Sequence, residues 1–270
     1  MKNEKSTFFD IEARHKRLAS MRIIENVTIS ELYSLLVLTN NDGSPLPDML
    51  PGQFVQIAVP DAPHTFLRRP ISVCMHDKQN NTLWLLIRRA GEGTSKLCDM
   101  KAGCILSVIL PLGKGFGMPG KQTEKLLLIG GGVGVAPLLY LGRCLAERGF
   151  NPEFLLGARS GNDLLLLDEF KKYGVVHTST DDGSFGEHGV VTQHSRCSEP
   201  FDRIYCCGPA PMMKAVAKVA KSQNAWCEVS LENMMACGVG ACLCCVEKTV
   251  RGNVCVCTEG PVFNINELTW

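Results

Sequence analysis

Four cysteines near the C-terminal end place the strongest constraint on this chain. Cys237, Cys242 and Cys245 follow a C-x4-C-x2-C spacing, and Cys257 follows after one short excursion. This is the plant-type ligand spacing of a [2Fe–2S] cluster, in which four thiolates hold two irons and a loop wraps closely around them. The segment is therefore predicted to be a small, glycine-rich cluster domain.

The residues between the cysteines fit this prediction. Gly238 and Gly240 have no side chain where backbone amides must approach the sulfides and where positive φ is expected. A zinc site remains an alternative, although it usually has two C-x2-C pairs with a longer spacer, and chance clustering of thiols is another. Cys257 is the preferred fourth ligand because residues 259–261 form a turn that could return it to the cluster. The same segment holds two further thiols that could substitute, Cys244 and Cys255.

Composition narrows the class of protein. A chain of 270 residues with 45% hydrophobic residues can hold two domains and an appendage. Its net charge of +1 produces no electrostatic field that would attract nucleic acid or an anionic membrane. The first 20 residues carry charges throughout and have no apolar signal-peptide core. The 14 cysteines are therefore expected to be reduced or bound to iron, in the cytoplasm.

The region from residue 21 to about residue 112 alternates short apolar runs with turn residues and has no long helical period. This pattern predicts a small antiparallel barrel. The most apolar stretch, residues 126–142, contains five glycines and a proline. We interpret it as a buried strand, turn and helix rather than a membrane span. Residues 1–20 are predicted to be an extension, with a short helix as one option.

Two segments of the barrel carry groups that suit a diphosphate. In the run Arg69-Pro70-Ile71-Ser72, a guanidinium fork and a hydroxyl lie at a strand edge. The alternative is a solvated edge strand interrupted by proline. Residues 91–95 form a glycine-rich turn before a short predicted helix, whose free N–H groups could bind phosphate.

A second glycine-rich segment follows the linker at residues 111–122. Residues 125–129 are predicted to be a buried strand, and GGGVGVAP at 130–137 leads into a helix. Strand, glycine turn and helix N-terminus form an anion cradle, with Pro137 in the first helical turn. The segment departs from the G-x-G-x-x-G fingerprint, and a tight structural turn is an equal alternative.

The remainder of this region predicts an α/β domain. Residues 154–158 are expected to form a strand, residues 164–174 a helix, and residues 204–206 a buried strand. A turn at residues 207–209 then opens a helix with Met212, Met213, Val216 and Val219 on its inner side.

These motifs together resemble the ferredoxin–NADP reductase superfamily. The resemblance implies that FAD is bound by the R-P-x-S segment, the strand end at 86–88 and the Gly-Thr turn. It also implies a pyridine nucleotide bound by G-G-G-x-G-x-A-P and by the C-G-P turn beside the nicotinamide. For Cys207 the alternative is a small buried thiol at a strand end. The implied cofactor-binding residues are Arg69, Pro70, Ile71, Ser72, Leu86, Ile87, Arg88, Gly93, Thr94, Gly130, Gly132, Gly134, Pro137, Cys207, Gly208 and Pro209.

A longer resemblance covers roughly residues 22–265. Residues 230–242 and 256–263, with RRPIS, TDDGSFGEHG and CGPAPMM, are similar to the iron–sulfur electron-transfer subunits of NAD-dependent dihydroorotate dehydrogenases. This implies electron transfer from an FMN-containing catalytic subunit through [2Fe–2S] and FAD to NAD+, in de novo pyrimidine (UMP) biosynthesis. It also implies a heterotetramer with two copies of each subunit. No residue of this chain is assigned to dihydroorotate chemistry.

The predicted fold is therefore multi-domain α+β. An extension (1–20) precedes a FAD-binding antiparallel β-barrel (21–118), an α/β parallel-sheet NAD-binding domain (119–226) and a [2Fe–2S] domain (227–270). A related alternative is the NAD(P)H-linked subunit of a ferredoxin-dependent transhydrogenase or sulfhydrogenase. Arg159 stands at a strand end where an acidic residue would favour NAD and an arginine could favour NADP. A cysteine-rich scaffold with structural zinc is the non-enzymatic alternative.

Overall fold

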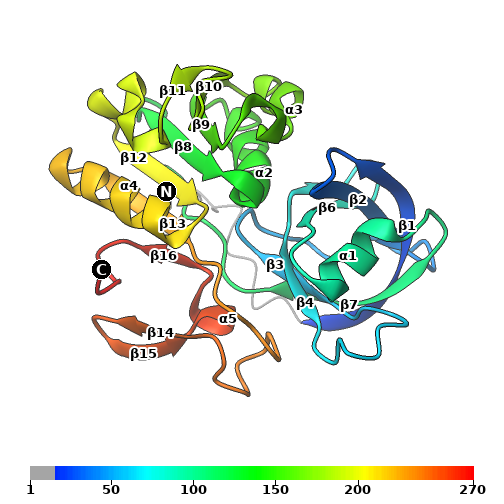
Figure 1. Ribbon diagram of the computed structural model, residues 1–270. Coiled ribbons are helices and arrows are strands. Elements are labelled where there is room, and N and C mark those ends of the chain that lie inside the picture. The colour runs from blue at the N-terminus through cyan, green and yellow to red at the C-terminus, as the bar shows by residue number, and fades with distance from the viewer. Residues whose placement is uncertain (1–15) are drawn as a thin grey trace, which may run out of the picture.

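The computed structural model describes residues 16–270, which form three lobes (Figure 1). Residues 1–15, including most of the predicted extension and its optional helix, lie outside the described part. The first lobe contains β1 (Arg17–Thr28), β2 (Tyr33–Asn40), β3 (Phe54–Ile57), β4 (Arg69–Ser72), β5 (Met75–Asp77), β6 (Thr82–Arg88), α1 (Glu92–Asp99) and β7 (Ile105–Leu112).

The second lobe is an α/β unit. It contains β8 (Leu126–Gly131), η1 (Gly132–Gly134), α2 (Val135–Ala146), β9 (Pro152–Ala158), η2 (Gly161–Asp163), α3 (Leu167–Lys171), β10 (Val175–Thr180), β11 (Glu187–His188), η3 (Val191–Gln193), η4 (Ser195–Ser198), β12 (Arg203–Cys207), α4 (Ala210–Ser222) and β13 (Trp226–Ser230). The third lobe contains β14 (Val246–Thr249), β15 (Gly252–Cys255), α5 (Val256–Glu259) and β16 (Val262–Asn264).

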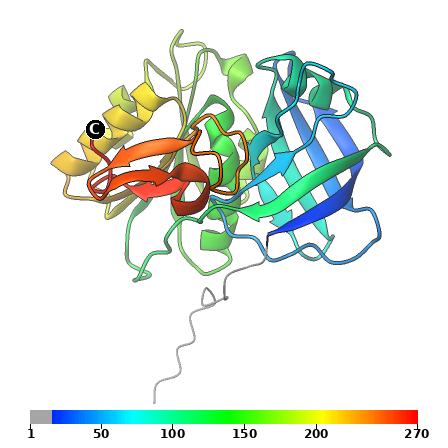
Figure 2. The same ribbon diagram turned by 90° about the horizontal axis from the view of Figure 1, so that it is seen from below.

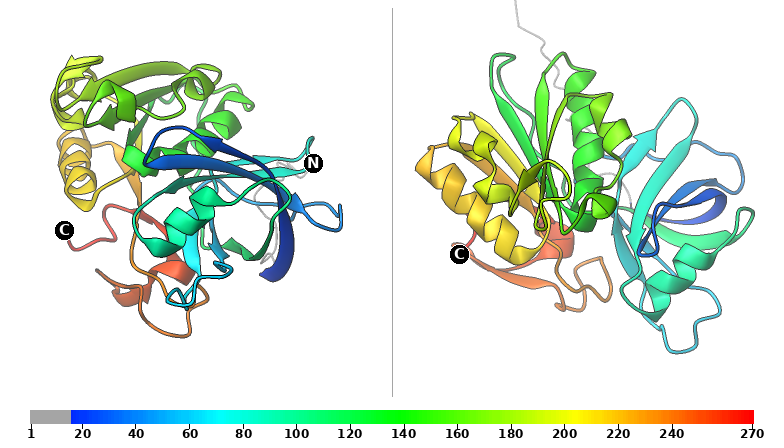
Figure 3. Two further views of the ribbon diagram at one scale, coloured as in Figure 1. Left: turned by 45° about the vertical axis from the view of Figure 1, so that its right-hand side comes forward. Right: turned by 45° about the horizontal axis from the view of Figure 1, so that its top comes forward.

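The first lobe is a curled antiparallel sheet in the order β4-β3-β7-β1-β2-β6-β5. Its strands pack a continuous apolar core, and α1 lies against the sheet, as Figure 3 shows. The antiparallel barrel-like fold predicted from the sequence is confirmed. Its first strand begins at Arg17 rather than at residue 21, because Arg17–Arg22 pairs with Leu110–Ile105 of β7.

The second lobe is built on the sheet β11-β10-β9-β8-β12-β13-β16, in which only β16 runs antiparallel to its neighbour. Helices α2 and α4 cover opposite faces (Figure 3). All of β8 is buried, as its apolar run predicted. The helix expected over residues 164–174 is much shorter, because Leu166 adopts a left-handed conformation immediately before α3.

Helix α4 buries a slightly different face from the predicted one. Met213 and Val216 are buried as expected, together with Ala217 and Ala220. Met212 is only half-buried: it lies over the glycine turn, where a Cβ built on Gly131 would be 2.6 Å from its sulfur. Val219, also expected inside, is half-buried.

The third lobe returns to the parallel sheet. Its last strand, β16, pairs with β13, so both strands lie in the nucleotide sheet although the domain boundary was expected at residue 226. The β14–β15 hairpin lies beside the sheet, and α5 lies between the hairpin and the barrel (Figure 2). A buried apolar cluster that includes Val229, Val256, Cys257 and Phe263 joins this lobe to the sheet.

The barrel and the α/β lobe also share a core. Leu138 and Tyr140 of α2 belong to the same apolar cluster as Met49 and Met75 of the barrel. The Tyr140 hydroxyl donates a hydrogen bond to the Met49 carbonyl at 3.0 Å. Within residues 16–270, none of the helices combines the length and the apolar character needed to cross a membrane.

Candidate cofactor and electron-transfer site

The guanidinium of Arg69 lies against the first turn of α1. A Cβ built on Gly93 would be 2.8 Å from Arg69 Nε and 2.9 Å from Thr65 Cγ2, so the guanidinium occupies space that only a glycine leaves open. The Thr94 hydroxyl accepts a hydrogen bond from the Ala90 N–H at 2.9 Å and so fixes the turn. The fold thus brings together two segments that the sequence offered separately. A guanidinium beside helix N-terminal N–H groups suits a diphosphate.

The neighbouring arginine has a different role. Arg68 donates to the Ser107 carbonyl at 2.7 Å and to the Ser107 hydroxyl at 2.9 Å, so it ties β4 to β7. Pro70, Ile71 and Ser72 are half-buried on the edge strand β4 and remain accessible to a ligand.

The strand end at 86–88 divides into two parts. Leu86 and Ile87 bury their side chains in the barrel core, so only their backbone groups could reach a cofactor. Arg88 is exposed and pairs with Tyr33 across the β2–β6 ladder. Tyr33 was not singled out from the sequence, because its position depends on pairing with a strand about 50 residues away.

The glycine-rich turn after β8 packs directly on the turn after β12. A Cβ built on Gly134 would be 2.6 Å from both the carbonyl carbon and the oxygen of Cys207 and from the Gly208 nitrogen. Gly132 has φ +56°, a conformation that favours glycine. Gly130 is the penultimate residue of the buried strand β8, and Pro137 lies in the first turn of α2. Only glycine at position 134 allows this contact between the two predicted nucleotide turns.

A cavity of about 520 Å³ opens at the carboxyl ends of β8, β9 and β10. This is where open parallel sheets bind ligands. Its lining joins Tyr33 and Arg88 of the barrel to residues of the α/β lobe. The polar lining also includes Arg159, Asp163 and Asp181. Asp163 ends η2 and Asp181 follows β10, and neither was predicted as a site residue from the sequence.

Cys207 and Glu232 meet beside the predicted nicotinamide turn. Cys207 Sγ is 3.9 Å from Glu232 Oε1. Burial raises the pKa of the Cys207 thiol well above its ordinary value. The Glu232 side chain keeps access to solvent, yet the surrounding protein desolvates its carboxylate and raises its pKa, while the charge of Arg88 partly offsets this. Sequence reasoning missed Glu232 because its partner lies 25 residues earlier.

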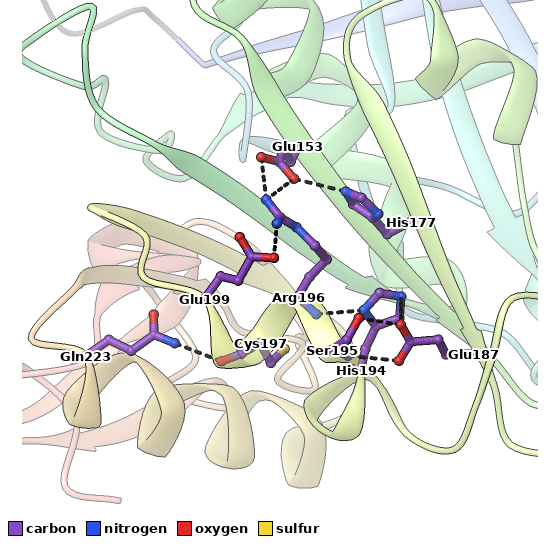
Figure 4. A network of polar contacts seen from close by, with 9 residues as sticks. All are labelled: Glu153, His177, Glu187, His194, Ser195, Arg196, Cys197, Glu199 and Gln223. Atoms are coloured by element: carbon purple, nitrogen blue, oxygen red, sulfur yellow. Dashed lines mark hydrogen bonds and ion pairs between the residues drawn. The ribbon is translucent and has the colours of Figure 1, made fainter.

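The outer wall of the cavity includes Val190, Val191 and Thr192. Side-chain contacts hold the following segment in place (Figure 4). Arg196 donates to both Glu153 oxygens at 2.7 and 2.6 Å, and His177 Nε2 lies 2.9 Å from Glu153 Oε2. These contacts attach the outer wall of the cavity, together with the segment that follows it, to β9 and β10.

His194 lies at the centre of this wall and is almost fully buried. Its Nδ1 accepts the Arg196 N–H at 3.0 Å, and its Nε2 is 3.4 Å from Glu187 Oε1. These contacts fit a neutral imidazole with its proton on Nε2. Burial lowers the pKa of His194, against the opposing charge of Glu187.

The predicted cluster loop already forms a thiolate-binding turn. Cys237 Sγ accepts the backbone N–H groups of Val239 at 3.4 Å, Ala241 at 3.3 Å and Cys242 at 3.4 Å. Partial burial opposes ionisation, but these N–H groups and the Cys242 side chain lower the pKa of Cys237 to about 6. Gly238 and Gly240 have φ +70° and +89°, as expected for a loop that wraps around a cluster.

Two of the remaining predicted ligands, Cys245 and Cys257, lie at the base of the loop. Cys245 and Cys257 are buried, and the Cys257 N–H donates to Cys245 Sγ at 3.4 Å. Burial and the neighbouring Cys245 raise the pKa of Cys257 to about 12. Cys242 is exposed at the loop surface. Of the two further thiols, Cys255 is half-buried and Cys244 is exposed.

The turn after Cys257 is anchored to the barrel. The Lys114 side chain forms an ion pair with Glu259 at 2.9 Å. The backbone N–H of Lys114 donates a hydrogen bond to the Gly260 carbonyl at 2.6 Å. Throughout residues 16–270, no three His, Cys, Asp or Glu side chains gather closely enough to hold a single metal ion.

Comparison with known proteins finds family models and solved structures that are similar to this chain. Residues 232–269 match the family model described as the iron–sulfur cluster binding domain of dihydroorotate dehydrogenase B, and residues 128–218 match an oxidoreductase NAD-binding domain. A solved structure described as an NADH-dependent reduced ferredoxin-NADP oxidoreductase is 30% identical, with a TM-score of 0.81 and coverage of 92% of this chain and 89% of that one. The ferredoxin reductase in carbazole 1,9a-dioxygenase, 21% identical with a TM-score of 0.67, covers 78% of this chain and 67% of that one and shares the fold.

Curated relatives are similar along most of their length. A protein of Shouchella clausii is 41% identical over 81% of this chain and 86% of its own length. One of Listeria monocytogenes is 39% identical over 92% of this chain and 97% of its own length. Both are named dihydroorotate dehydrogenase B (NAD(+)), electron transfer subunit. Their similarity and the cluster-domain match agree with the flavin, nucleotide and cluster elements described above, and the chain belongs to the family of electron transfer subunits of dihydroorotate dehydrogenase B (NAD(+)).

Proposed function

We propose that this chain passes electrons from an FMN-containing dihydroorotate dehydrogenase catalytic subunit through a [2Fe–2S] cluster and FAD to NAD+, in de novo pyrimidine (UMP) biosynthesis. When bound, the cluster carries single electrons, the flavin exchanges one or two, and NAD+ accepts a hydride. The partner subunit supplies the oxidation of dihydroorotate to orotate. The proposed assembly is a heterotetramer with two copies of each subunit.

One observation carries this proposal: residues in or next to the three predicted sites contact one another. Gly134 of the nucleotide turn packs on Cys207, and Cys207 lies 3.9 Å from Glu232, five residues before Cys237. On the other side, Gly238 of the cluster loop packs on Gln56 of β3, the neighbour of the flavin strand β4. Cofactors held at these places would lie close enough to exchange electrons in sequence.

The residues have separate proposed tasks. Arg69, Ser72, Gly93 and Thr94 bind and orient FAD at the edge of the barrel. The accompanying backbone and side-chain contacts come from Pro70, Ile71, Leu86, Ile87 and Arg88. Gly130, Gly132, Gly134 and Pro137 hold the nucleotide phosphates, and Cys207, Gly208 and Pro209 pack beside the nicotinamide. Cys237, Cys242, Cys245 and Cys257 hold the irons.

We infer a reducing, cytoplasmic setting from the thiols. All 14 cysteines lie within residues 16–270, and none of them is joined in a disulfide there. Free thiols at this density persist in a reducing compartment, where iron can occupy some of them.

The test is co-purification of the full chain with its partner, followed by an anaerobic assay of NAD+ reduction by dihydroorotate. We expect the complex to reduce NAD+ and each subunit alone to fail, because the proposal places the nucleotide site on this chain and the dihydroorotate site on the partner. NAD+ reduction by the catalytic subunit alone, or none by a cofactor-loaded complex, would contradict the proposal.

A second candidate is the NAD(P)H-linked FAD/[2Fe–2S] subunit of a ferredoxin-dependent transhydrogenase or sulfhydrogenase. The 30% identical solved structure and Arg159 at the cavity favour it. The higher identity of the curated relatives and the acidic Asp163 and Asp181 beside Arg159 favour the first proposal. Comparing NAD+ with NADP+ as acceptor in the same assay separates the two, since an acidic side chain that binds the ribose hydroxyl disfavours the extra phosphate of NADP+.

A further inference from the structure

The side-chain amide of Gln56 has no hydrogen-bond partner although Gln56 is completely buried. Its exposed fraction is 0%, and neither Nε2 nor Oε1 has a partner among residues 16–270. An unpaired buried amide destabilises the folded chain, because it loses its hydrogen bonds to water and gains none in return. A nearby buried glutamine, Gln53, shows the usual arrangement: its amide binds the Leu50 N–H and the Gly113 carbonyl, both at 2.8 Å. The amide of Gln56 is therefore available to a group other than the protein chain.

The position of Gln56 indicates which group that is. A Cβ built on Gly238 would be 2.6 Å from Gln56 Cγ and 2.7 Å from its Nε2, so the cluster loop lies directly on this side chain. Gly238 follows Cys237, whose sulfur already accepts three backbone N–H groups. In the β3–β4 ladder Gln56 is paired with Pro70 of the flavin strand. The amide thus lies between the predicted flavin strand and the predicted cluster loop.

The chemistry of a cluster determines which end of the amide it would meet. Thiolates and sulfides carry negative charge and only accept hydrogen bonds, so the amide N–H must face them. We propose that Gln56 Nε2 donates a hydrogen bond to a sulfur of the [2Fe–2S] site and thereby positions the cluster against the flavin strand. The proposal rests on the cluster assignment made above. Hydrogen bonds to cluster sulfurs stabilise the reduced form, which has one more negative charge, and raise the reduction potential.

The test is an EPR-monitored redox titration of the full, cofactor-loaded chain with Gln56→Leu. Leucine has a similar volume and cannot donate. At a fixed applied potential the ratio of reduced to oxidised cluster is expected to fall about tenfold, which corresponds to a midpoint about 59 mV lower for a one-electron couple. The flavin midpoint, followed by absorbance in the same titration, is expected to stay unchanged.

Two further variants serve as controls. Gln53→Leu removes a buried amide of the same size whose partners are backbone groups, so it is expected to lower stability and leave the cluster potential unchanged. Gln56→Asn keeps the amide but withdraws it by one methylene, and an intermediate shift is expected. An unchanged cluster potential in Gln56→Leu, or a shift confined to the flavin, would overturn the inference.

A measurement on the unsubstituted chain covers the case in which Gln56→Leu does not fold. Pulsed EPR of reduced protein labelled with nitrogen-15 in its glutamine side chains should show coupling between the cluster and an amide nitrogen. Absence of that coupling in a chain with full cluster content would refute the role of Gln56 alone. Absence of any iron–sulfur signal would instead refute the proposed function.

Discussion

At the scale of single residues, two adjacent arginines have different environments. Arg68 is fixed between β4 and β7 by Ser107, whereas Arg69 faces Gly93 in the first turn of α1. Sequence position alone could not separate them, since both occur in one basic pair before a proline. The contacts show that Arg68 attaches the strand, and they support the proposal that Arg69 binds phosphate.

The double variant Arg69→Ala with Ser72→Ala tests this assignment. It should lower the flavin content of the purified chain because the diphosphate loses its guanidinium and the edge strand loses its hydroxyl. Iron content should stay the same, since the cluster loop contacts Gln56 of β3 instead. Flavin absorbance and iron analysis measure both.

Arg68→Ala is the matched control for that experiment. It removes the same charge one residue earlier and should lower the midpoint of urea unfolding while the folded protein keeps its flavin. Stoichiometric flavin in the double variant would show that these two side chains do not hold FAD.

At the scale of elements, contact between two turns organises the nucleotide site. Gly134 opens α2 with its Cα against the backbone of Cys207 and Gly208. Gly134→Ala should separate the turns and weaken NAD+ binding, with a loss of about 1–3 kcal/mol in unfolding free energy from overpacking. Isothermal titration with NAD+ and urea unfolding test the two effects.

Gly120→Ala is the control for that substitution. A Cβ there would meet only the Glu124 side chain, at 3.6 Å, and the position lies in the linker. NAD+ affinity should not change in this variant. Equal affinities in Gly134→Ala and the parent chain would mean that the close turn contact has no role in binding.

The wall containing η3 and η4 should respond to pH. His194 is neutral in the folded chain because burial lowers its pKa, while the unfolded chain takes up a proton at about pH 6.5. Below that pH the unfolded state binds more protons, so the unfolding free energy should fall as the pH decreases. Protonation of Nδ1 would also break its contact with the Arg196 N–H and loosen the segment that lines the cavity.

His194→Asn isolates this contribution, since an amide oxygen can replace Nδ1 as the acceptor and does not titrate. Urea midpoints between about pH 5 and pH 8 should vary less in the variant than in the parent chain. The decrease in NAD+ affinity at acidic pH should also be smaller in the variant than in the parent chain. Parallel pH profiles for the two chains would exclude His194 as the group responsible.

At the scale of the whole molecule, local signals and long-range packing determined different parts of the site. The buried runs of β8 and β12, the glycine turns and the cysteine spacing were predictable because each depends on neighbouring residues. The sequence did not identify three residues of the site, because the role of each depends on a partner far away in the chain. These residues are Tyr33, Glu232 and Gln56. The shortened α3 was missed because a left-handed residue interrupts an apolar run that otherwise suits a helix.

The arrangement of the lobes brings the cluster domain into contact with both of the other two. Its loop packs on β3 of the barrel, its turn is held by Lys114, and its last strand joins the nucleotide sheet. A change at one ligand of the exposed loop should therefore interrupt electron entry while the flavin and nucleotide sites remain assembled.

The most direct test compares Cys242→Ser with Cys244→Ser in the complex with the catalytic subunit. Both thiols are exposed on one loop, but only Cys242 is a proposed ligand. For Cys242→Ser we expect that NADH still reduces the bound flavin, whereas NAD+ reduction by dihydroorotate falls to the background of the catalytic subunit alone. Cys244→Ser should retain both activities. Dihydroorotate-dependent NAD+ reduction at the unaltered rate in Cys242→Ser would contradict the proposed electron path.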